Sequence, residues 1–121
     1  MIRAAVIWGF VALPATALAV HAESFLSLAM DAGAGVHNFA TADSAAEAQT
    51  SALKACKELA GGCEIVLTRA NLCASLAYDY SNGGFGVGTD VDADVAQSNA
   101  VPICTSYGNP NCQIVETICA K

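Results

Sequence analysis

Six cysteines are the residues of this sequence with the clearest capacity for chemistry. They are Cys56, Cys63, Cys73, Cys104, Cys112 and Cys119. A structural zinc site favours closely spaced pairs such as Cys-x-x-Cys, and no two cysteines here have that spacing. An even number of cysteines in a small exported chain indicates a disulfide framework instead. We therefore expect three disulfides and no metal site.

One histidine lies beyond the N-terminal segment and is the first candidate for acid–base catalysis. In a hydrolase, His37 would act as the base for a nearby serine or cysteine. The internal duplication described below places Phe85 at the equivalent position, so the second copy does without a histidine. With the cysteines expected in disulfides, we expect His37 to be an ordinary strand residue. The protein is then expected to be neither an enzyme nor a carrier of a cofactor.

Three alternating aspartates, Asp90, Asp92 and Asp94, resemble the start of a calcium-binding loop. Such a loop needs glycine at its sixth position and glutamate at its twelfth, and this chain has Val95 and Val101 there. Carboxylates are also favoured at the first turn of a helix, where free amides and the helix dipole attract negative charge. We expect these aspartates to cap a helix.

Tyrosines and aspartates around a predicted turn suggest a surface for a protein partner. Tyr78 and Tyr80 are spaced to lie on one face of a strand. Aromatic and acidic side chains together suit contact with a basic protein. The alternative is that the tyrosines only cover an edge of the core. The candidate partner-binding residues are Tyr78, Asp79, Tyr80, Asp90 and Asp92.

Residues 1–22 have the pattern of a secretory signal peptide. Arg3 precedes an uncharged run of 17 residues, and small residues at Val20 and Ala22 occupy the positions that a signal peptidase reads. The run is shorter than the ~20 apolar residues that span a bilayer. We expect cleavage after Ala22 and export of a single domain, residues 23–121, to the periplasm or out of the cell.

The remaining 99 residues are acidic. They carry four Lys or Arg and eleven Asp or Glu, a net charge of −7. A surface of this sign repels nucleic-acid phosphates and anionic lipid headgroups. Nucleic acid and the membrane surface are therefore disfavoured as partners, and a basic protein is the better one. The alternative is that the acidity only keeps an exported protein in solution.

The elements that must position these residues come from an internal duplication. Residues 27–31 read SLAMD, and SLAYD follows 48 positions later. The alignment of the two halves runs without a gap as far as Cys56 and Cys104, and one inserted residue then restores it to the end. A constant register over so many positions indicates two copies of one unit. The expected repeats span about residues 24–72 and 73–121.

Each copy predicts the order strand, turn, strand, helix, strand. Alternating apolar residues favour strands in SFLSLAM and VHNFA, and Asn82-Gly83 favours a tight hairpin in the second copy. The β-branched runs EIVLT and QIVETI favour the third strands. We expect an α+β fold in which the duplicated strand–strand–helix–strand unit forms antiparallel sheet with two helices packed on it. The sequence leaves the strand order open.

The two predicted helices differ. Ser44 and Glu47 form a capping box at the start of the first helix, and Gly61 ends it. In the second helix Pro102 removes an amide and crowds the preceding turn, so this helix is expected to be shorter and to end or kink near Val101. Glycines alternate on one face of a strand and let a helix approach closely: Gly84, Gly86 and Gly88.

Two motifs carry a resemblance to a known family. The pattern A-x3-A-x3-C-x6-C over residues 48–63, with N-x-C-x-S-L-A over residues 71–77, resembles the small exported bacterial proteins of the domain of unknown function 4189 family. The same cysteine spacing recurs at Cys104 and Cys112 with one residue inserted. The resemblance covers nearly the whole chain after residue 22. It implies a duplicated, disulfide-stapled α+β module, mostly exported, and no established activity.

The six cysteines allow fifteen pairings, and the duplication favours those that treat both halves alike. A cysteine at the end of each predicted helix lies close in sequence to one at the start of the following strand, so a bridge there is sterically easy. The remaining two cysteines are expected to join the halves. The expected pairs are Cys56–Cys63, Cys104–Cys112 and Cys73–Cys119.

These features favour a non-enzymatic protein-binding module of the bacterial envelope or exterior. One form of this hypothesis is an acidic inhibitor or immunity protein that occupies a basic hydrolase such as a lysozyme. The alternative is a structural envelope or secreted effector protein without a single tight partner. Salt separates the two, because an acidic surface that binds a basic partner loses affinity at high ionic strength.

Overall fold

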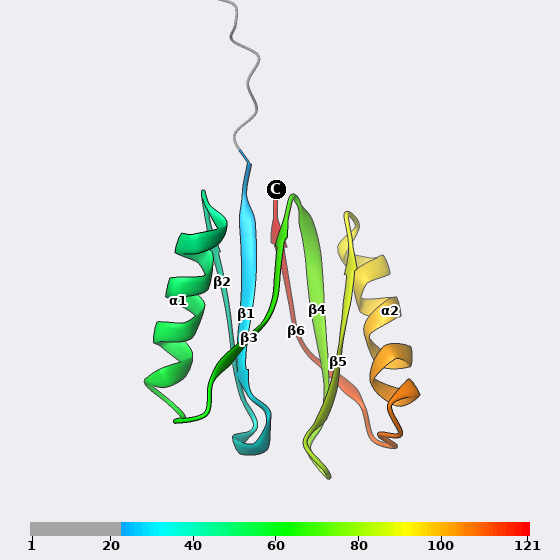
Figure 1. Ribbon diagram of the computed structural model, residues 1–121. Helices are drawn as coiled ribbons and strands as arrows, with labels where there is room; N and C mark the ends of the chain where they lie inside the picture. The colour runs from blue at the N-terminus through cyan, green and yellow to red at the C-terminus, as the bar shows by residue number, and fades with distance from the viewer. Residues whose placement is uncertain (1–22) are drawn as a thin grey trace, which may run out of the picture.

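The computed structural model describes residues 23–121 and shows the predicted unit twice (Figure 1). Each half runs strand, strand, helix, strand. The predicted signal peptide, residues 1–22, lies outside the described residues. The first half contains β1 (Phe25–Asp31), the short 3-10 helix η3 (Ala32–Ala34), β2 (Val36–Ala42), α1 (Ala45–Lys57) and β3 (Glu64–Ala70). The second half contains β4 (Leu72–Asp79), β5 (Gly84–Asp90), α2 (Ala93–Ser106) and β6 (Gln113–Ala120).

Each half forms an antiparallel sheet of its own. The strand orders are β2-β1-β3 and β5-β4-β6, so the first strand of each copy is central. Both sheets shift register at the equivalent place, between Leu28 and Ala29 and between Leu76 and Ala77. In Figure 1 the helices lie on the two outer faces and the six strands lie between them. The α+β class is confirmed. The sequence left the strand order open, and the structure shows two separate three-stranded sheets.

The core lies between the two sheets. Successive side chains of a strand point to opposite faces, so Leu28 and Met30 of β1 lie on one face with Leu76 and Tyr78 of β4 across from them. These four side chains form one buried cluster, flanked by aromatic and aliphatic residues from the edge strands. The intervening residues, such as Ala29, point to the outer faces and pack under the helices.

Small residues allow the helices to lie close to the sheets. Ser44 caps α1 by accepting a hydrogen bond of 3.2 Å from the Glu47 amide, as the capping motif predicts. In α2 the cap is Asp92, which accepts from the amides of Asp94 and Val95. The buried helix residues are Ala48, Ala52 and Cys56 in α1 and Ala96, Ala100 and Cys104 in α2. Neither helix of residues 23–121 is long and apolar enough to span a membrane.

The expectation of a shortened second helix was wrong. Helix α2 has 14 residues against 13 in α1, and it continues through Pro102 to Ser106. Pro102 is exposed, so the backbone group left without a helical partner is open to water. The turn beyond it is held from outside the helix, because Cys104 is bonded to Cys112 and its carbonyl accepts from the Asn109 side chain.

The glycine strip on β5 has the packing role that its spacing predicts. A Cβ atom on Gly86 would lie 2.4 Å from the backbone nitrogen of Cys104, and one on Gly88 would lie 2.2 Å from the carbonyl oxygen of Ala96. Both neighbours are backbone atoms of α2, which a side-chain rotation cannot move. Helix α2 therefore rests directly on the backbone of β5.

The three disulfides are the pairs that the symmetry of the two halves favours, Cys56–Cys63, Cys104–Cys112 and Cys73–Cys119. The first two link each helix end to the strand that follows. The expectation that Cys73–Cys119 joins the halves was wrong, since Cys73 lies on β4 and Cys119 is its register partner on β6. Both strands belong to the second sheet, so no disulfide links the two halves.

We predict that replacing Gly88 by alanine destabilises the protein by about 1–3 kcal/mol, because the new methyl group overlaps the backbone of α2. Chemical denaturation of the oxidised protein measures this loss. Gly61→Ala is the control, as a Cβ there has no atom within 4 Å and should change stability by less than about 1 kcal/mol. Equal effects of the two substitutions would contradict this packing.

Candidate functional site

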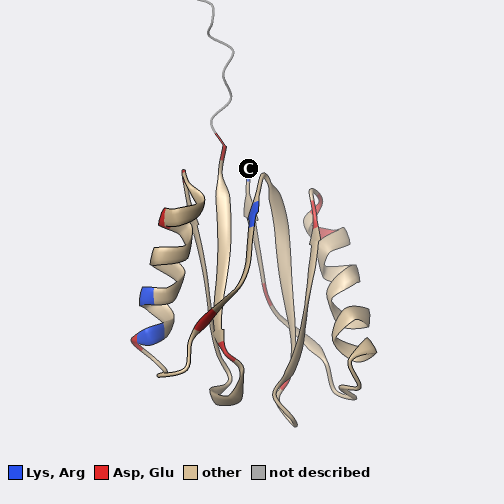
Figure 2. Ribbon diagram, in the orientation of Figure 1, with Lys and Arg blue, Asp and Glu red and all other residues tan. Residues whose placement is uncertain are grey.

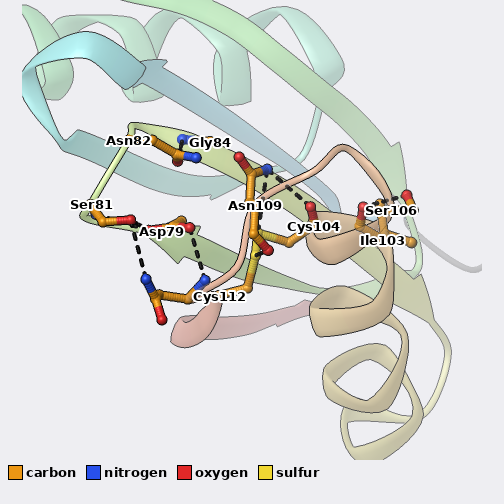
Figure 3. Close-up of a disulfide and its surroundings, with 10 residues drawn as sticks. Asp79, Ser81, Asn82, Gly84, Ile103, Cys104, Ser106, Asn109 and Cys112 are labelled. Carbon is orange, nitrogen blue, oxygen red and sulfur yellow. Dashed lines mark hydrogen bonds between the residues drawn. A yellow bond between two sulfur atoms is a disulfide. The ribbon is translucent and has the colours of Figure 1, made fainter.

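The residues that the two copies share serve the fold. The aspartate that ends each SLAxD motif ties the hairpin to the loop before the third strand. Asp31 accepts from the amides of Ala34 (3.2 Å) and Gly62 (2.9 Å). Asp79 accepts from the amide (2.8 Å) and hydroxyl of Ser81 and from the amide of Asn111 (2.9 Å). Figure 3 shows Asp79 beside this loop and the Cys104–Cys112 bond.

Hydrogen bonds hold Asp79 in its charged form. The Ser81 hydroxyl has the largest effect and lowers the pKa of the Asp79 carboxyl, with the backbone amides of Asn111, Ser81 and Asn82 adding to it. Burial acts in the opposite direction and is outweighed. A buried carboxylate with this many donors is a structural anchor, because its lone pairs are already occupied by the chain itself.

A second shared feature is a polar network behind each sheet. Ser27 lies 3.2 Å from the Thr68 hydroxyl, which accepts a 2.9 Å hydrogen bond from Gln49 of α1. The second copy repeats the network with Ser75, Thr117 and Gln97. The Thr117 hydroxyl lies 2.9 Å from the Ser75 hydroxyl and accepts a 2.9 Å hydrogen bond from the Gln97 side chain. These buried serines bind the helix to the central and third strands. Within residues 23–121, the members of each network are a serine, a threonine and a glutamine.

The two copies differ where an edge strand of one sheet meets an edge strand of the other. On one side the side chains of His37 on β2 and Glu116 on β6 form a hydrogen bond of 2.8 Å. On the other side the equivalent positions hold Phe85 of β5 and Leu67 of β3, which both pack against the core between the sheets. One side of the molecule is thus closed by a polar pair and the opposite side is apolar.

The apolar side contains a groove, which we name the β5 groove. Its volume is about 530 Å³, and it runs along β5 between Val66 of β3 and the last turns of α2. Its apolar lining residues are Val66, Phe85, Val87, Ile103 and Tyr107. Val66 is 38 % exposed and Tyr107 is 73 % exposed, so a partner could cover both. Such a volume is within the range of ligand-binding clefts.

The loop after α2 shapes one end of this groove. Asn109 is buried, and its side chain donates a 2.9 Å hydrogen bond to the Cys104 carbonyl. Gly84 makes room for it, because a Cβ on Gly84 would lie 1.9 Å from the Asn109 side-chain oxygen. Figure 3 shows Asn109 between Gly84 and Cys104. The groove is therefore built by the same loop that the Cys104–Cys112 disulfide fixes.

A second hollow continues from the first toward the hairpin of the first half. It has a volume of about 320 Å³ and shares Val66 and Phe85 with the β5 groove. Its charged lining residues are Asp31 and Glu64. The apolar groove thus ends beside two carboxylates. Within residues 23–121 neither hollow is lined by a lysine or an arginine.

Comparison with known families agrees with this architecture. A family model described as Domain of unknown function (DUF4189) matches residues 25–119. The chain belongs to the DUF4189 family. The match covers both repeats and all six cysteines, which confirms the resemblance seen in the sequence motifs. No curated protein and no solved structure matches the chain.

The structure of this DUF4189 protein does not bring the five candidate partner-binding residues together. Tyr78 and Asp79 are buried, and Tyr80 is 60 % exposed beyond the end of β4. Asp90 pairs with Cys73 at the opposite end of the same strands, about 20 Å away at ~3.3 Å per residue. Asp92 caps α2 at that far end. These residues therefore lie at two opposite ends of the second sheet.

Tyr78 instead links the two halves. Its hydroxyl donates to the carbonyl of Ala32 in the first half, and its ring lies 4.6 Å from that of Tyr80. Burial raises the pKa of Tyr78, and the nearby Tyr80, Asp31 and Asp79 raise it further. This matches the alternative that a tyrosine here covers the edge of the core.

The three alternating aspartates serve the helix start. Asp90 accepts from the Asp92 amide at 2.9 Å, and Asp92 accepts from the amide of Asp94 at 2.8 Å. The expected capping role is therefore confirmed at Asp92. Across the described part of the chain, no group of three His, Cys, Asp or Glu side chains is placed to hold a metal ion.

Sequence reasoning missed the residues that line the β5 groove. A position-by-position comparison of the two copies could have found them. Tyr107 aligns with Leu59, Ile103 aligns with Ala55, and Phe85 aligns with His37. The second copy is the more aromatic or bulky at each of these positions. Such differences within a duplicated fold mark surfaces that packing alone does not require.

We predict that Asp79 makes stability depend on acid pH. Its pKa is lowered in the folded state, so its contribution is complete above the ordinary aspartate pKa of about 3.9 and is lost as pH falls through the lowered value. The difference in the free energy of unfolding between the native protein and Asp79→Asn should therefore be larger at pH 7 than at pH 2.5. Urea unfolding at both pH values measures it.

The control for this experiment is Asp43→Asn, since Asp43 is exposed. It should leave stability unchanged at either pH. If Asp79→Asn lowers the free energy of unfolding equally at pH 7 and pH 2.5, the charge of Asp79 does not stabilise the fold.

Proposed function

We propose that this protein is a non-enzymatic binding module for a basic protein. The observation that carries the proposal is the distribution of charge over the two halves. Residues 73–120 contain five carboxylates and no lysine, arginine or histidine. Only Asp79 among the five is buried, so four of them contribute to the surface of the second half.

The few cations of the protein lie elsewhere. Figure 2 shows the basic residues on α1 and β3 and at the C-terminus, with α2 free of them. Two of the four are Lys54 and Lys57, in the last turn of α1, where the negative end of the helix dipole attracts their positive charge. The carboxylates of Asp90, Asp92 and Asp94 lie together at the start of α2, so a basic partner would be attracted to that end of the second half.

The chemistry of the side chains favours binding over catalysis. All six cysteines are in disulfides, so none is available as a thiolate nucleophile. In the described residues, the hydrogen-bond partner of the His37 side chain is Glu116, and no serine or threonine hydroxyl contacts it. A hydrolase with a serine or cysteine nucleophile would need a hydroxyl or thiol at that position.

The finer form of the proposal is an exported inhibitor or immunity protein that occupies a basic hydrolase. Three disulfides in one small domain are typical of proteins that work in an oxidising compartment. A rigid, cross-linked, acidic domain suits the steered binding of a basic enzyme, because little conformational entropy is lost on association.

We predict that the immobilised oxidised protein retains a basic protein from an extract of the bacterial envelope and releases it at high salt. Asp92→Asn with Asp94→Asn should weaken this binding by about 2- to 30-fold, since each exposed ion pair contributes about 0.2–1 kcal/mol. Asparagine remains an adequate helix cap, so α2 should stay folded. Surface plasmon resonance with the retained protein measures the change.

The matched control changes the start of α1, with Asp43→Asn and Glu47→Gln, which remove the same charge from the first half. It should leave the affinity within about twofold. A retained protein that is neutral or acidic, or equal loss in both double variants, would overturn the proposal. Inhibition of the retained protein's hydrolase activity by the oxidised protein tests the inhibitor form.

A further inference from the structure

The inner wall of the β5 groove is the free edge of a strand. Strand β5 is the outer strand of its sheet and pairs only with β4. In an antiparallel edge strand, every second residue directs its amide and carbonyl away from the neighbouring strand. These backbone groups are ready-made partners for one more strand. Because β5 has seven residues, an added segment would span about 20 Å.

The two sides of the groove suit the alternating side chains of such a strand. Successive residues of an added strand would point toward opposite sides. One side is bounded by Val66 of β3, and the other by Ile103 and Tyr107 of α2. The α2 side is apolar, whereas the β3 side continues from Val66 to the carboxylates of Glu64 and Asp31, so apolar side chains fit toward α2 and positive ones toward β3. Tyr107 is exposed and aromatic, the kind of residue that anchors a protein contact.

The equivalent sheet edge in the first half is linked to the other sheet by a side-chain contact. There β2 is the outer strand, and His37 on it forms the 2.8 Å hydrogen bond with Glu116 of the other sheet. The second copy has Phe85 and Leu67 at these positions and forms no such pair. The duplicated fold has therefore left one sheet edge bridged and the other with a groove beside it.

Charge selects among possible occupants of the groove. The groove continues into the hollow lined by Asp31 and Glu64, and neither hollow is lined by a cation in residues 23–121. Positive side chains on the added strand would lie near these carboxylates. A second copy of this chain fits poorly, because its β5 sequence, GFGVGTD, has no cation and its whole second half is acidic.

We propose that the β5 groove binds an extended segment of the partner by strand addition, and that this segment alternates small apolar residues with lysine or arginine. This inference rests on the proposed binding of a basic protein and names the part of the partner that is recognised. The backbone of β5 supplies hydrogen bonds, Val66 and Tyr107 supply apolar contacts, and Asp31 and Glu64 supply the charge preference.

The test uses the oxidised protein expressed from its full chain and a synthetic peptide, Lys-Val-Lys-Val-Lys-Val-Lys with blocked ends. We expect the peptide to shift the NMR signals of residues 84–90 and to slow hydrogen exchange of amides on β5. Tyr107→Ala should weaken its binding about tenfold. Leu59→Ala, the equivalent exposed position of the first half, should leave binding unchanged.

Two further peptides sharpen the test. A peptide with glutamate in place of lysine should bind much more weakly, and one with proline at its centre should not add to a strand. The inference is overturned if the glutamate peptide binds equally, if Leu59→Ala has the larger effect, or if β5 shows no protection. It is also overturned if sedimentation shows a dimer whose formation protects β5, because the occupant is then a second copy.

The outcomes separate this inference from the proposed function. If a retained basic protein binds Tyr107→Ala and Val66→Lys as tightly as the native protein, the groove is not its site and the proposed function stands. If the lysine peptide binds the groove as expected while the envelope yields no basic partner, strand addition stands and the proposed function fails.

Discussion

Apolar packing between the two sheets is the interaction on which this structure depends. Leu28 and Met30 from one half meet Leu76 and Tyr78 from the other, and no disulfide crosses between the halves. Each half alone would leave the apolar face of a three-stranded sheet in water, which is costly for a unit of about 50 residues. The duplication stabilises the fold, because each copy buries the apolar face of the other. The groove beside β5 follows from it, as it lies where the edges of the two sheets meet.

The duplication also separates residues that build the fold from residues available for function. The shared aspartates, serines and glutamines anchor hairpins and helices in both halves with nearly equal geometry. The copies differ where the edges of the two sheets meet, with a His37–Glu116 hydrogen bond on one side and an apolar groove on the other. The surface of this DUF4189 protein that is available for binding is therefore one where the two copies differ, such as the β5 groove.

Local patterns in the sequence predicted local structure well. The repeat, the order of elements, the caps at Ser44 and Asp92 and the three cysteine pairs all follow from spacing and side-chain chemistry. The separation into two sheets could not be predicted in this way, because alternation shows which face of a strand is apolar but not what covers that face. The distance between Asp79 and Asp90 could not be predicted either, because they lie at opposite ends of paired strands. The end of α2 was predicted wrongly from Pro102, because contacts outside the helix stabilise its last turn. These contacts are the Cys104–Cys112 disulfide and the hydrogen bond from Asn109.

The most direct test of this account is to cut the chain between the halves. A protease site inserted at Asn71, the exposed residue joining β3 to β4, allows cleavage of the folded, oxidised protein. The account predicts that native mass spectrometry finds the two halves bound together after cleavage, and that denaturation without reductant separates them completely. Halves that stay covalently joined in denaturant would show a disulfide across the core. Halves that part under native conditions would show that packing between the sheets does not hold the molecule together.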